Sequence, residues 1–348
     1  MKALTFRGTG RIEYETVPDP RLLAPGDVIV KTRLCAICGS DMHVYHGRER
    51  GLDPGTVMGH EFIGEIVETG REVQRFRVGD AVFSPFFSAC GGCFYCEQDL
   101  SCRCQRGQLF GWVERGVGLQ GVQAEFVRVP LADTTLYAIP EAVEDEAALL
   151  LCDILPTGWF CADMAGARPG GSYAVIGCGP VGLLAIISLR EMGAGQILAV
   201  DLVPERRAMA ARLGAIPFDG ASPDLVKNIH GLSGGRGPDA VLEVVGLPAA
   251  QQLAYLLVRP GGVLAVAGVH NAAKFAFQPA DLYNKNLTYR TGRCPVQRYV
   301  PRLLPLVQQR KYDFSALISH RLPLRDGVRG YEMFDQKIEG CTKVVLRP

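Results

Sequence analysis

The chain has 348 residues, of which 48% are hydrophobic and 21% are charged. This length fits about two domains of roughly 100–200 residues each and excludes a disordered or fibrous protein. Lys and Arg number 37 against 36 Asp and Glu, so the net charge of +1 indicates neither a nucleic acid nor an anionic membrane as partner. A neutral small molecule fits this balance better.

Short strands are predicted in the first 150 residues, where β-rich segments are bounded by Gly, Pro or Asp. These segments cover residues 28–34, 61–70, 79–86 and 124–130. They predict an all-β module.

From about Glu144 the pattern changes to helical spacing, and apolar strands then alternate with helices. The predicted strands cover residues 172–177, 196–201, 239–246 and 261–268, and the predicted helices cover 180–192, 204–213 and 248–257. This alternation predicts an α/β fold with a parallel, doubly wound sheet. After Cys294 the chain leaves the pattern, with a helix near 299–310 and a strand-like end, and we expect this tail to join the N-terminal module.

The composition includes twelve cysteines, which a long chain does not need for disulfides. The N-terminal twenty residues show no apolar signal-peptide region, so we expect a reducing cytoplasm with thiolates available to metals. The longest uncharged stretch, residues 169–189, contains five glycines and is interpreted as a glycine-rich turn rather than a membrane span.

That stretch contains a G-x-G-x-x-G motif, GCGPVG at residues 177–182, between a predicted strand and a predicted helix. The first glycine permits a tight turn, the second lets the backbone approach a pyrophosphate, and the third lets the helix pack on the strand. Asp201 ends the next strand, where an acid binds the adenosine ribose. The predicted dinucleotide site comprises Gly177, Gly179, Pro180, Val181, Gly182 and Asp201.

Asp201 also favours NAD over NADP. A carboxylate about 4 Å from a 2′-phosphate would repel it by up to about 4 kcal/mol per charge at an effective dielectric constant near 20. The nearby Arg206 and Arg207 offer the alternative, since either could soften that repulsion or accept a 2′-phosphate.

Two groups of residues have the chemistry of zinc ligands. Cys90, Cys93, Cys96 and Cys104 follow a C-x2-C-x2-C-x7-C spacing, which suits a tetrahedral, closed and therefore structural zinc; Cys102 could replace Cys104. The second group is dispersed: Cys38 in CAICGSDMH, His60 with Glu61 in GHE, and Asp153 in LCDILPTGW. Three ligands with an open fourth position would make a catalytic zinc.

The order of these motifs resembles the zinc-dependent medium-chain alcohol dehydrogenases along essentially the whole chain. CAICGSDMH, GHE, GDAV, the four-cysteine lobe, AEFVRVP, PTG, GCGPVG and RPGG follow one another as in that family. LCDILPTGW and the C-terminal segments look most like the formaldehyde-dehydrogenase-like subgroup and other bacterial secondary-alcohol and polyol dehydrogenases. The resemblance implies a GroES-like catalytic domain at 1–153, completed by 295–348, and a Rossmann NAD-binding domain at 154–294.

The resemblance also implies residue roles. Cys38, His60 and Asp153 would bind catalytic zinc, with Cys152 as the alternative to Asp153. Glu61 would orient the site or bind zinc transiently. Ser40 and His43 match a proton-relay pair, Thr157 and Val269 match residues near the nicotinamide, and Arg206 matches a basic residue near the adenosine ribose. Lys343 matches a basic group directed toward the pyrophosphate.

We therefore expect an oxidoreductase that transfers a hydride between an alcohol or polyol and NAD, giving an aldehyde or ketone. It would hold one catalytic and one structural zinc and form a homodimer or homotetramer. The alternatives are an NAD-retaining aldehyde dismutase and a non-catalytic protein that binds zinc and a dinucleotide. A zinc-independent reductase of the same superfamily would lack both the cysteine lobe and the Cys38/His60 pair.

Overall fold

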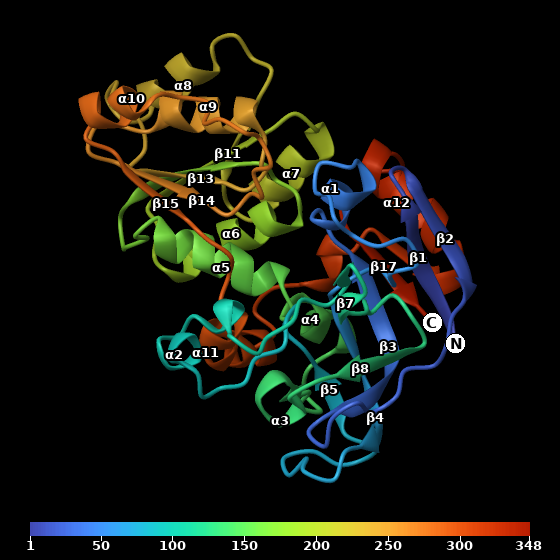
Figure 1. The fold of residues 1–348 in the computed structure, drawn as a ribbon. Helices are drawn as coiled ribbons and strands as arrows, with labels where there is room; N and C mark the ends of the chain where they lie inside the picture. The colour runs from blue at the N-terminus through green and yellow to red at the C-terminus, as the bar shows by residue number, and fades with distance from the viewer. The chain divides into compact units, whose positions relative to one another are not determined.

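The computed structural model describes residues 1–348 and divides into two compact units (Figure 1). Unit 1 comprises Met1–Asp153 together with Pro295–Pro348, and unit 2 comprises Ile154–Cys294. No helix in either unit has the length and apolar composition that crossing a membrane requires.

The main sheet of unit 1 has seven strands, and its C-terminal part comes from the far end of the chain. Its order is β16 (His320–Pro323), β17 (Val344–Arg347), β3 (Val28–Ile37), β4 (Phe62–Thr69), β5 (Ala81–Phe83) and β9 (Tyr137–Ala138), with β8 (Phe126–Val129) also beside β3. Two hairpins accompany it, namely β1 (Lys2–Gly8) with β2 (Arg11–Thr16) and β6 (Trp112–Glu114) with β7 (Val117–Leu119). Because β17 pairs antiparallel with β3, the C-terminal segment completes this sheet.

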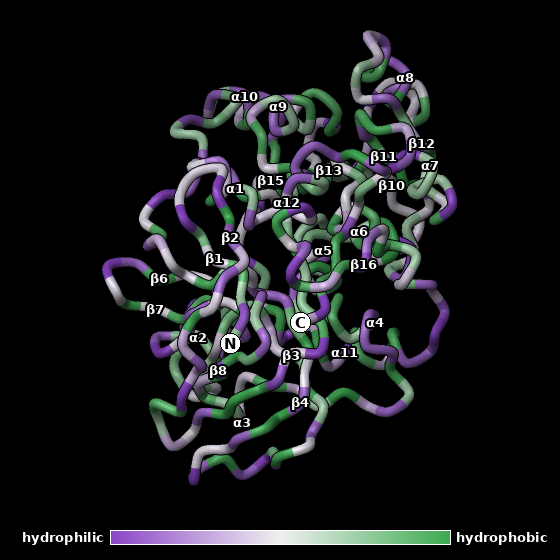
Figure 2. Tube along the Cα trace, turned by 90° about the vertical axis from the view of Figure 1, so that its right-hand side faces the viewer, coloured by the Kyte–Doolittle hydropathy of each residue, from purple (hydrophilic) through white to green (hydrophobic).

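The helices of unit 1 are mostly short. They are α1 (Asp41–Tyr45), α2 (Phe94–Glu97), α3 (Ala132–Thr135), α4 (Asp145–Leu150), α11 (Val296–Gln308) and α12 (Gly327–Gln336), with 3-10 turns at Ser101–Arg103, Ser315–Leu317 and Leu324–Asp326. Helix α12 packs closely on the sheet, because a Cβ on Gly330 would lie 3.1 Å from Ile37 Cδ1 and 3.2 Å from Val344 Cγ1. In Figure 2 the tip of the β6–β7 hairpin is hydrophilic.

Unit 2 is a parallel, doubly wound sheet, as the alternation of strands and helices predicts. The strand order is β12 (Ile216–Asp219), β11 (Gln196–Asp201), β10 (Ser172–Ile176), β13 (Ala240–Glu243), β14 (Val263–Val266) and β15 (Thr288–Thr291). The helices are α5 (Ile154–Met164), α6 (Pro180–Glu191), α7 (Pro204–Arg212), α8 (Leu225–Gly231), α9 (Pro248–Leu257) and α10 (Pro279–Asn284). Figure 1 shows α8 and α9 on one face of the sheet and α5 and α6 on the other.

The strand order of unit 2 places a switch point between β10 and β13. The chain runs outward from β10 through β11 to β12, and then returns to the other side of β10 as β13. Crossover connections leave in opposite directions there, and doubly wound sheets bind their ligands outside the carboxyl ends of the strands at such a point. The glycine-rich residues 177–182 directly follow β10.

Candidate active site

Four side chains of unit 1 form a compact cluster of metal-type donors. Cys38, His60, Glu61 and Asp153 each offer one ligand atom, and these atoms all lie within 4.8 Å of one another. The antiparallel register of β3 and β4, in which Cys35 pairs with Phe62, explains why the end of one strand lies beside the start of the other. Asp153 reaches the same place from the segment that follows α4.

Three of these donors converge most closely. Asp153 Oδ2 lies 3.6 Å from Cys38 Sγ and 3.4 Å from His60 Nε2. Their side chains are nearly buried, with 14% exposure for His60 and 13% for Asp153. One sulfur, one imidazole nitrogen and one carboxylate oxygen are all ordinary zinc ligands, so this donor set fits a zinc ion.

The protonation of the metal-free cluster follows from burial and neighbouring charge. Burial raises the pKa of the Cys38 thiol, and the Glu61 and Asp153 carboxylates add to that effect. Burial alone would lower the pKa of His60, but the Asp41 carboxylate and hydrogen bonds with Asp153 and Asp41 raise it well above its usual value. Without a metal, Cys38 and His60 therefore both hold their protons more strongly than usual, so the cluster attracts positive charge.

Asp41 also belongs to this site, although the sequence motifs do not indicate it. Its Oδ1 lies 3.3 Å from His60 Nδ1, and its Oδ2 accepts a hydrogen bond of 3.0 Å from the backbone N–H of Cys38. A carboxylate at Nδ1 fixes the imidazole orientation and leaves Nε2 for a metal. The available signal was an Asp three residues after Cys38, but its partner His60 is distant in sequence.

Of the two predicted relay residues, Ser40 lies beside this cluster and His43 lies in the adjoining helix α1. Ser40 precedes α1, and its Oγ lies 3.2 Å from His60 Nε2. His43 is buried within α1, and its backbone N–H donates to Ser40 O at 3.0 Å. The structure thus brings a hydroxyl within hydrogen-bond distance of the metal-type donors.

The four predicted cysteines of the lobe also come together. Cys90, Cys93, Cys96 and Cys104 place their sulfur atoms within 4.8 Å of one another, and Cys102 is buried outside this set. Backbone N–H groups of Gln105 and Cys96 lower the pKa of Cys93 to about 6, whereas burial raises that of Cys96 to about 12. None of the chain's cysteines forms a disulfide. Four thiol donors without room for a fifth ligand suit a closed zinc site.

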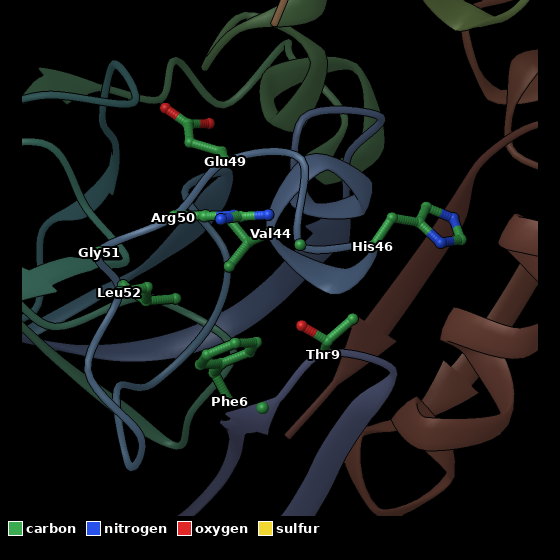
Figure 3. A pocket seen from close by; sticks show the side chains of 10 residues that line it. Phe6, Thr9, Val44, His46, Glu49, Arg50, Gly51 and Leu52 are labelled. Carbon is green, nitrogen blue, oxygen red and sulfur yellow. The ribbon is translucent and has the colours of Figure 1, made fainter.

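An open hollow of about 450 Å³ lies elsewhere in unit 1, between the β1–β2 turn, the end of α1 and residues 49–52 (Figure 3). None of the clustered donors lines it. His46 at its rim points toward α12, where its Nε2 lies 2.6 Å from Asp335 Oδ1. The hollow is therefore distinct from the metal-type cluster.

In unit 2 the glycine-rich turn has the geometry that its motif predicts. Gly177 has a φ of +93°, which favours glycine, and a Cβ on Gly182 would lie only 1.8 Å from Gly177 O. Gly179 is the N-cap of α6, which begins with Pro180 and Val181, and a Cβ there would meet only Arg206 Nη1, at 3.7 Å. The start of α6 is therefore open to an anion such as a pyrophosphate.

Asp201 ends β11 and connects it to this turn. Its Oδ2 accepts a 2.6 Å hydrogen bond from the Cys178 backbone N–H, and its Oδ1 accepts one of 2.8 Å from Val203 N–H. Of the two neighbouring arginines, Arg207 donates to the carbonyls of Asp201 and Leu202, whereas Arg206 lies near Gly179. Asp201 and Arg206 thus both lie beside the glycine-rich turn.

Comparisons with known proteins identify the family to which both units belong. A model described as an alcohol dehydrogenase GroES-like domain matches residues 24–141, and one described as a zinc-binding dehydrogenase matches residues 180–309. Zinc-type alcohol dehydrogenase B of Aspergillus flavus is 40% identical over 346 residues, covering 96% of this chain and 79% of the relative. The chain belongs to the zinc-binding medium-chain alcohol dehydrogenase family.

Two further relatives support this assignment. Glutathione-independent formaldehyde dehydrogenase of Pseudomonas aeruginosa is 32% identical over 395 residues, covering 100% of this chain and 97% of the relative. The solved structure of alcohol dehydrogenase TADH from Thermus sp. ATN1 matches with a TM-score of 0.92 and 41% identity, covering 100% of this chain and 99% of that one. The predicted family and the fold, a GroES-like domain plus a Rossmann-type parallel sheet, are confirmed.

In this alcohol dehydrogenase family member, Glu61 is paired with Lys343. Both side chains are buried, and Lys343 Nζ lies 2.8 Å from Glu61 Oε1 and 2.6 Å from Oε2. Burial alone would lower the pKa of Lys343, but the Glu61 and Cys38 charges raise it. Lys343 was expected to point toward a pyrophosphate; in the structure its ammonium group neutralises Glu61 instead.

The remaining predicted residues are Thr157 and Val269 in unit 2 and Cys152 in unit 1. Thr157 lies in the first half of α5, and Val269 follows β14 with 45% of its surface exposed. Cys152 is buried, and its thiol donates to Phe62 O at 3.1 Å. The Cys152 thiol is therefore hydrogen-bonded away from the donor cluster. Asp153, and not Cys152, belongs to that cluster.

Proposed function

We propose that this chain is an NAD-dependent zinc alcohol dehydrogenase that transfers a hydride between an alcohol or polyol and NAD, giving an aldehyde or ketone. The observation that carries the proposal is the convergence of Cys38 Sγ, His60 Nε2 and Asp153 Oδ2. Three zinc-type donors with a hydroxyl beside them suit a catalytic rather than a structural ion.

The charges of the cluster support zinc at this position. A Cys38 thiolate and the Asp153 carboxylate supply two negative charges, and His60 contributes a neutral nitrogen. Glu61 and Lys343 add no net charge because they neutralise each other. Bound zinc would act as a Lewis acid that lowers the pKa of an alcohol hydroxyl.

The chain's own residues would orient the metal ligands and move the proton. Asp41 holds the His60 ring through Nδ1 and the Cys38 backbone through its N–H. Ser40 Oγ, beside His60 Nε2, would accept the substrate's hydroxyl proton. His43 would exchange that proton with solvent, since imidazole titrates near physiological pH.

The crevice of unit 2 supports a dinucleotide, and Asp201 supports NAD as the preferred one. Gly179 leaves the start of α6 open for the pyrophosphate, and the Asp201 carboxylate would accept hydrogen bonds from ribose hydroxyls. The Cys90, Cys93, Cys96 and Cys104 site would hold a second, structural zinc. A cytoplasmic homodimer or homotetramer remains part of this proposal.

The experiment that tests this function is a screen of dinucleotide reduction over alcohols and polyols, with NAD⁺ or NADP⁺. We expect one substrate group to support steady reduction of NAD⁺ in preference to NADP⁺. The Asp201→Asn variant keeps an oxygen that can accept from the Cys178 N–H but loses the negative charge. It should therefore reduce the preference for NAD⁺ over NADP⁺.

Two outcomes, from this screen and from a parallel assay with aldehydes, would contradict the proposal. Absence of reduction with every alcohol, in a chain that holds two zinc ions and binds NAD⁺, would favour a non-catalytic binding protein. Conversion of an aldehyde to equal amounts of alcohol and acid, without release of NADH, would identify a dismutase.

A further inference from the structure

A buried acid lies at the carboxyl edge of the parallel sheet, outside the glycine-rich turn. Glu243 ends β13, and its side chain is fully buried. Its Oε1 accepts hydrogen bonds from the backbone N–H groups of Val245, at 2.7 Å, and Gly246, at 2.8 Å. Its Oε2 lies 2.6 Å from Nε2 of His270.

These contacts satisfy a group that would otherwise be costly to bury. A carboxylate in its ionised form only accepts hydrogen bonds, so ionised Glu243 requires the hydrogen in the His270 contact to be on Nε2. A buried carboxylate requires such partners. His270 belongs to the irregular segment after β14 and is mostly buried itself, with 18% exposure. Glu243 therefore ties the segment after β14 to the turn after β13.

The backbone around this pair is closely packed. A Cβ on Gly246, whose φ is +79°, would lie 2.5 Å from Val269 O, and one on Gly268 would lie 2.3 Å from Gly246 N. A Cβ on Gly177 would lie 2.6 Å from Val245 Cγ2. The turns that follow β10, β13 and β14 thus contact one another at the carboxyl edge of the sheet.

Apolar side chains on these turns remain exposed beside the buried polar pair. Val245 is 38% exposed and Val269 is 45% exposed. Their positions depend on the two turns that Glu243 and His270 connect. Val245 and Val269 therefore form an exposed apolar surface, and the Glu243–His270 hydrogen bond fixes the turns that carry it. Such a surface suits a flat, weakly polar ring as its ligand.

We propose that Glu243 and His270 are positioning residues that hold Val245 and Val269 against the nicotinamide half of the dinucleotide. This inference rests on the proposed dinucleotide function and deepens it. It assigns no role to the pair in binding the adenosine half, which in the proposed function would contact Asp201 and the glycine-rich turn, after β11 and β10.

The test compares the binding of NADH with that of ADP-ribose, which lacks the nicotinamide ring, to the full-length chain by calorimetry. In His270→Ala, the Kd of NADH should rise by about tenfold, the scale of one hydrogen bond to a charged group. The Kd of ADP-ribose should change by less than about twofold on the same scale. His270→Gln retains a donor and should restore much of the NADH affinity.

A double variant tests whether the two residues act as one unit. If they do, Glu243→Gln combined with His270→Ala should weaken NADH binding no more than the stronger single change. His230→Ala is the matched control, because His230 also makes a side-chain hydrogen bond within unit 2, to Leu257 O at 3.1 Å, but at the opposite ends of the strands. That control should leave both affinities unchanged.

Other outcomes would overturn the inference. If His270→Ala weakens ADP-ribose and NADH equally, or weakens neither, the pair does not position the nicotinamide half, while the dinucleotide function stands. If the unaltered chain binds neither NADH, NADPH nor ADP-ribose, the proposed function and this inference both fail.

Discussion

Adjacent side chains at residues 152 and 153 have different environments. Cys152 donates its thiol hydrogen to Phe62 O and is fully buried, while Asp153 lies between Cys38 and His60. Burial raises the pKa of Cys152, so its thiol resists ionisation. A neutral, hydrogen-bonded thiol is a poor metal ligand, and a carboxylate among zinc-type donors is a good one.

This difference gives a prediction for metal content. Asp153→Ala should reduce zinc from two ions per chain to one, because it removes one of three ligands and leaves the lobe intact. The matched change Cys152→Ala should retain both ions. Elemental analysis of the purified variants checks this, and the prediction is wrong if Cys152→Ala, rather than Asp153→Ala, loses the ion.

The lobe cysteines differ in acidity, and this difference can be measured in the metal-free chain. The pKa of Cys93 is lowered to about 6 by backbone N–H groups, whereas that of Cys96 is raised to about 12 by burial. The Cys93 thiolate fraction therefore rises as the pH rises through about 6. Alkylation should modify Cys93 first and accelerate over that range.

Mass spectrometry of briefly alkylated, chelator-treated protein locates the modified cysteine at each pH. Zinc returned before alkylation should protect all four lobe sulfurs. Modification of Cys96 before Cys93, or a Cys93 midpoint near the ordinary thiol value of about 8.5, would contradict the assigned environment.

Residue identity and spacing predicted much of this chemistry, but not the partners that support it. The lobe cysteines lie within fifteen residues of one another, so their spacing alone indicated a metal site. Asp41 and His60 meet only because β3 and β4 pair, and Lys343 meets Glu61 only because β17 joins that sheet. Single-sequence reasoning does not provide such long-range contacts.

At the scale of elements, two glycines in the turn from β10 into α6 have different roles. Gly182 allows close packing, since its Cβ would overlap Gly177 O, whereas Gly179 has space around it. Gly182→Ala should therefore lower the free energy of unfolding by about 1–3 kcal/mol through overpacking. Gly179→Ala should fold normally but weaken dinucleotide binding, because a methyl group would stand where the backbone approaches phosphate.

Thermal unfolding and calorimetry with NADH distinguish these effects. Gly179→Ala should match the unaltered chain in its melting temperature and differ in Kd. If instead Gly179→Ala unfolds early and Gly182→Ala is fully stable, the packing explanation for the motif is wrong.

Elements with strong local patterns were predictable, and those that depend on distant pairing were not. The strands β10, β11, β13 and β14 have apolar runs, and the structure places strands within all four predicted ranges. The sequence pattern does not predict β12 and β15, whose residues are largely exposed at the two edges of the sheet. Edge strands lack the apolar signal that burial on both faces imposes.

Helix α12, which is distant in sequence, supports the cluster of metal-type donors through a series of hydrogen bonds. Tyr331 donates its hydroxyl hydrogen to Gln123 Oε1 at 2.9 Å, and Gln123 Nε2 donates to Ala36 O at 3.0 Å. The same amide nitrogen lies 3.5 Å from Asp41 Oδ2. The C-terminal segment therefore contributes to unit 1 the strands β16 and β17 and the buried Tyr331 hydroxyl that holds Gln123.

At the scale of the whole molecule, each unit provides one part of the proposed chemistry. Unit 1 contains both clusters of zinc-type donors, and unit 2 contains the glycine-rich turn and Asp201. The family fixes the reaction class more firmly than the substrate, since one fold serves many substrates. The order of motifs along the chain was sufficient to predict that family.

The measurement that tests the central claim most directly is the rate of alcohol-dependent NAD⁺ reduction by Asp153→Ala, with the lobe zinc retained, against the unaltered chain. We predict a rate at least about a hundredfold lower, beyond the effect expected for a supporting residue alone. The NADH affinity of the same variant should stay unchanged, since unit 2 is unaltered. A rate within about threefold of the unaltered chain, a difference of less than about 1 kcal/mol in the barrier, would contradict the account.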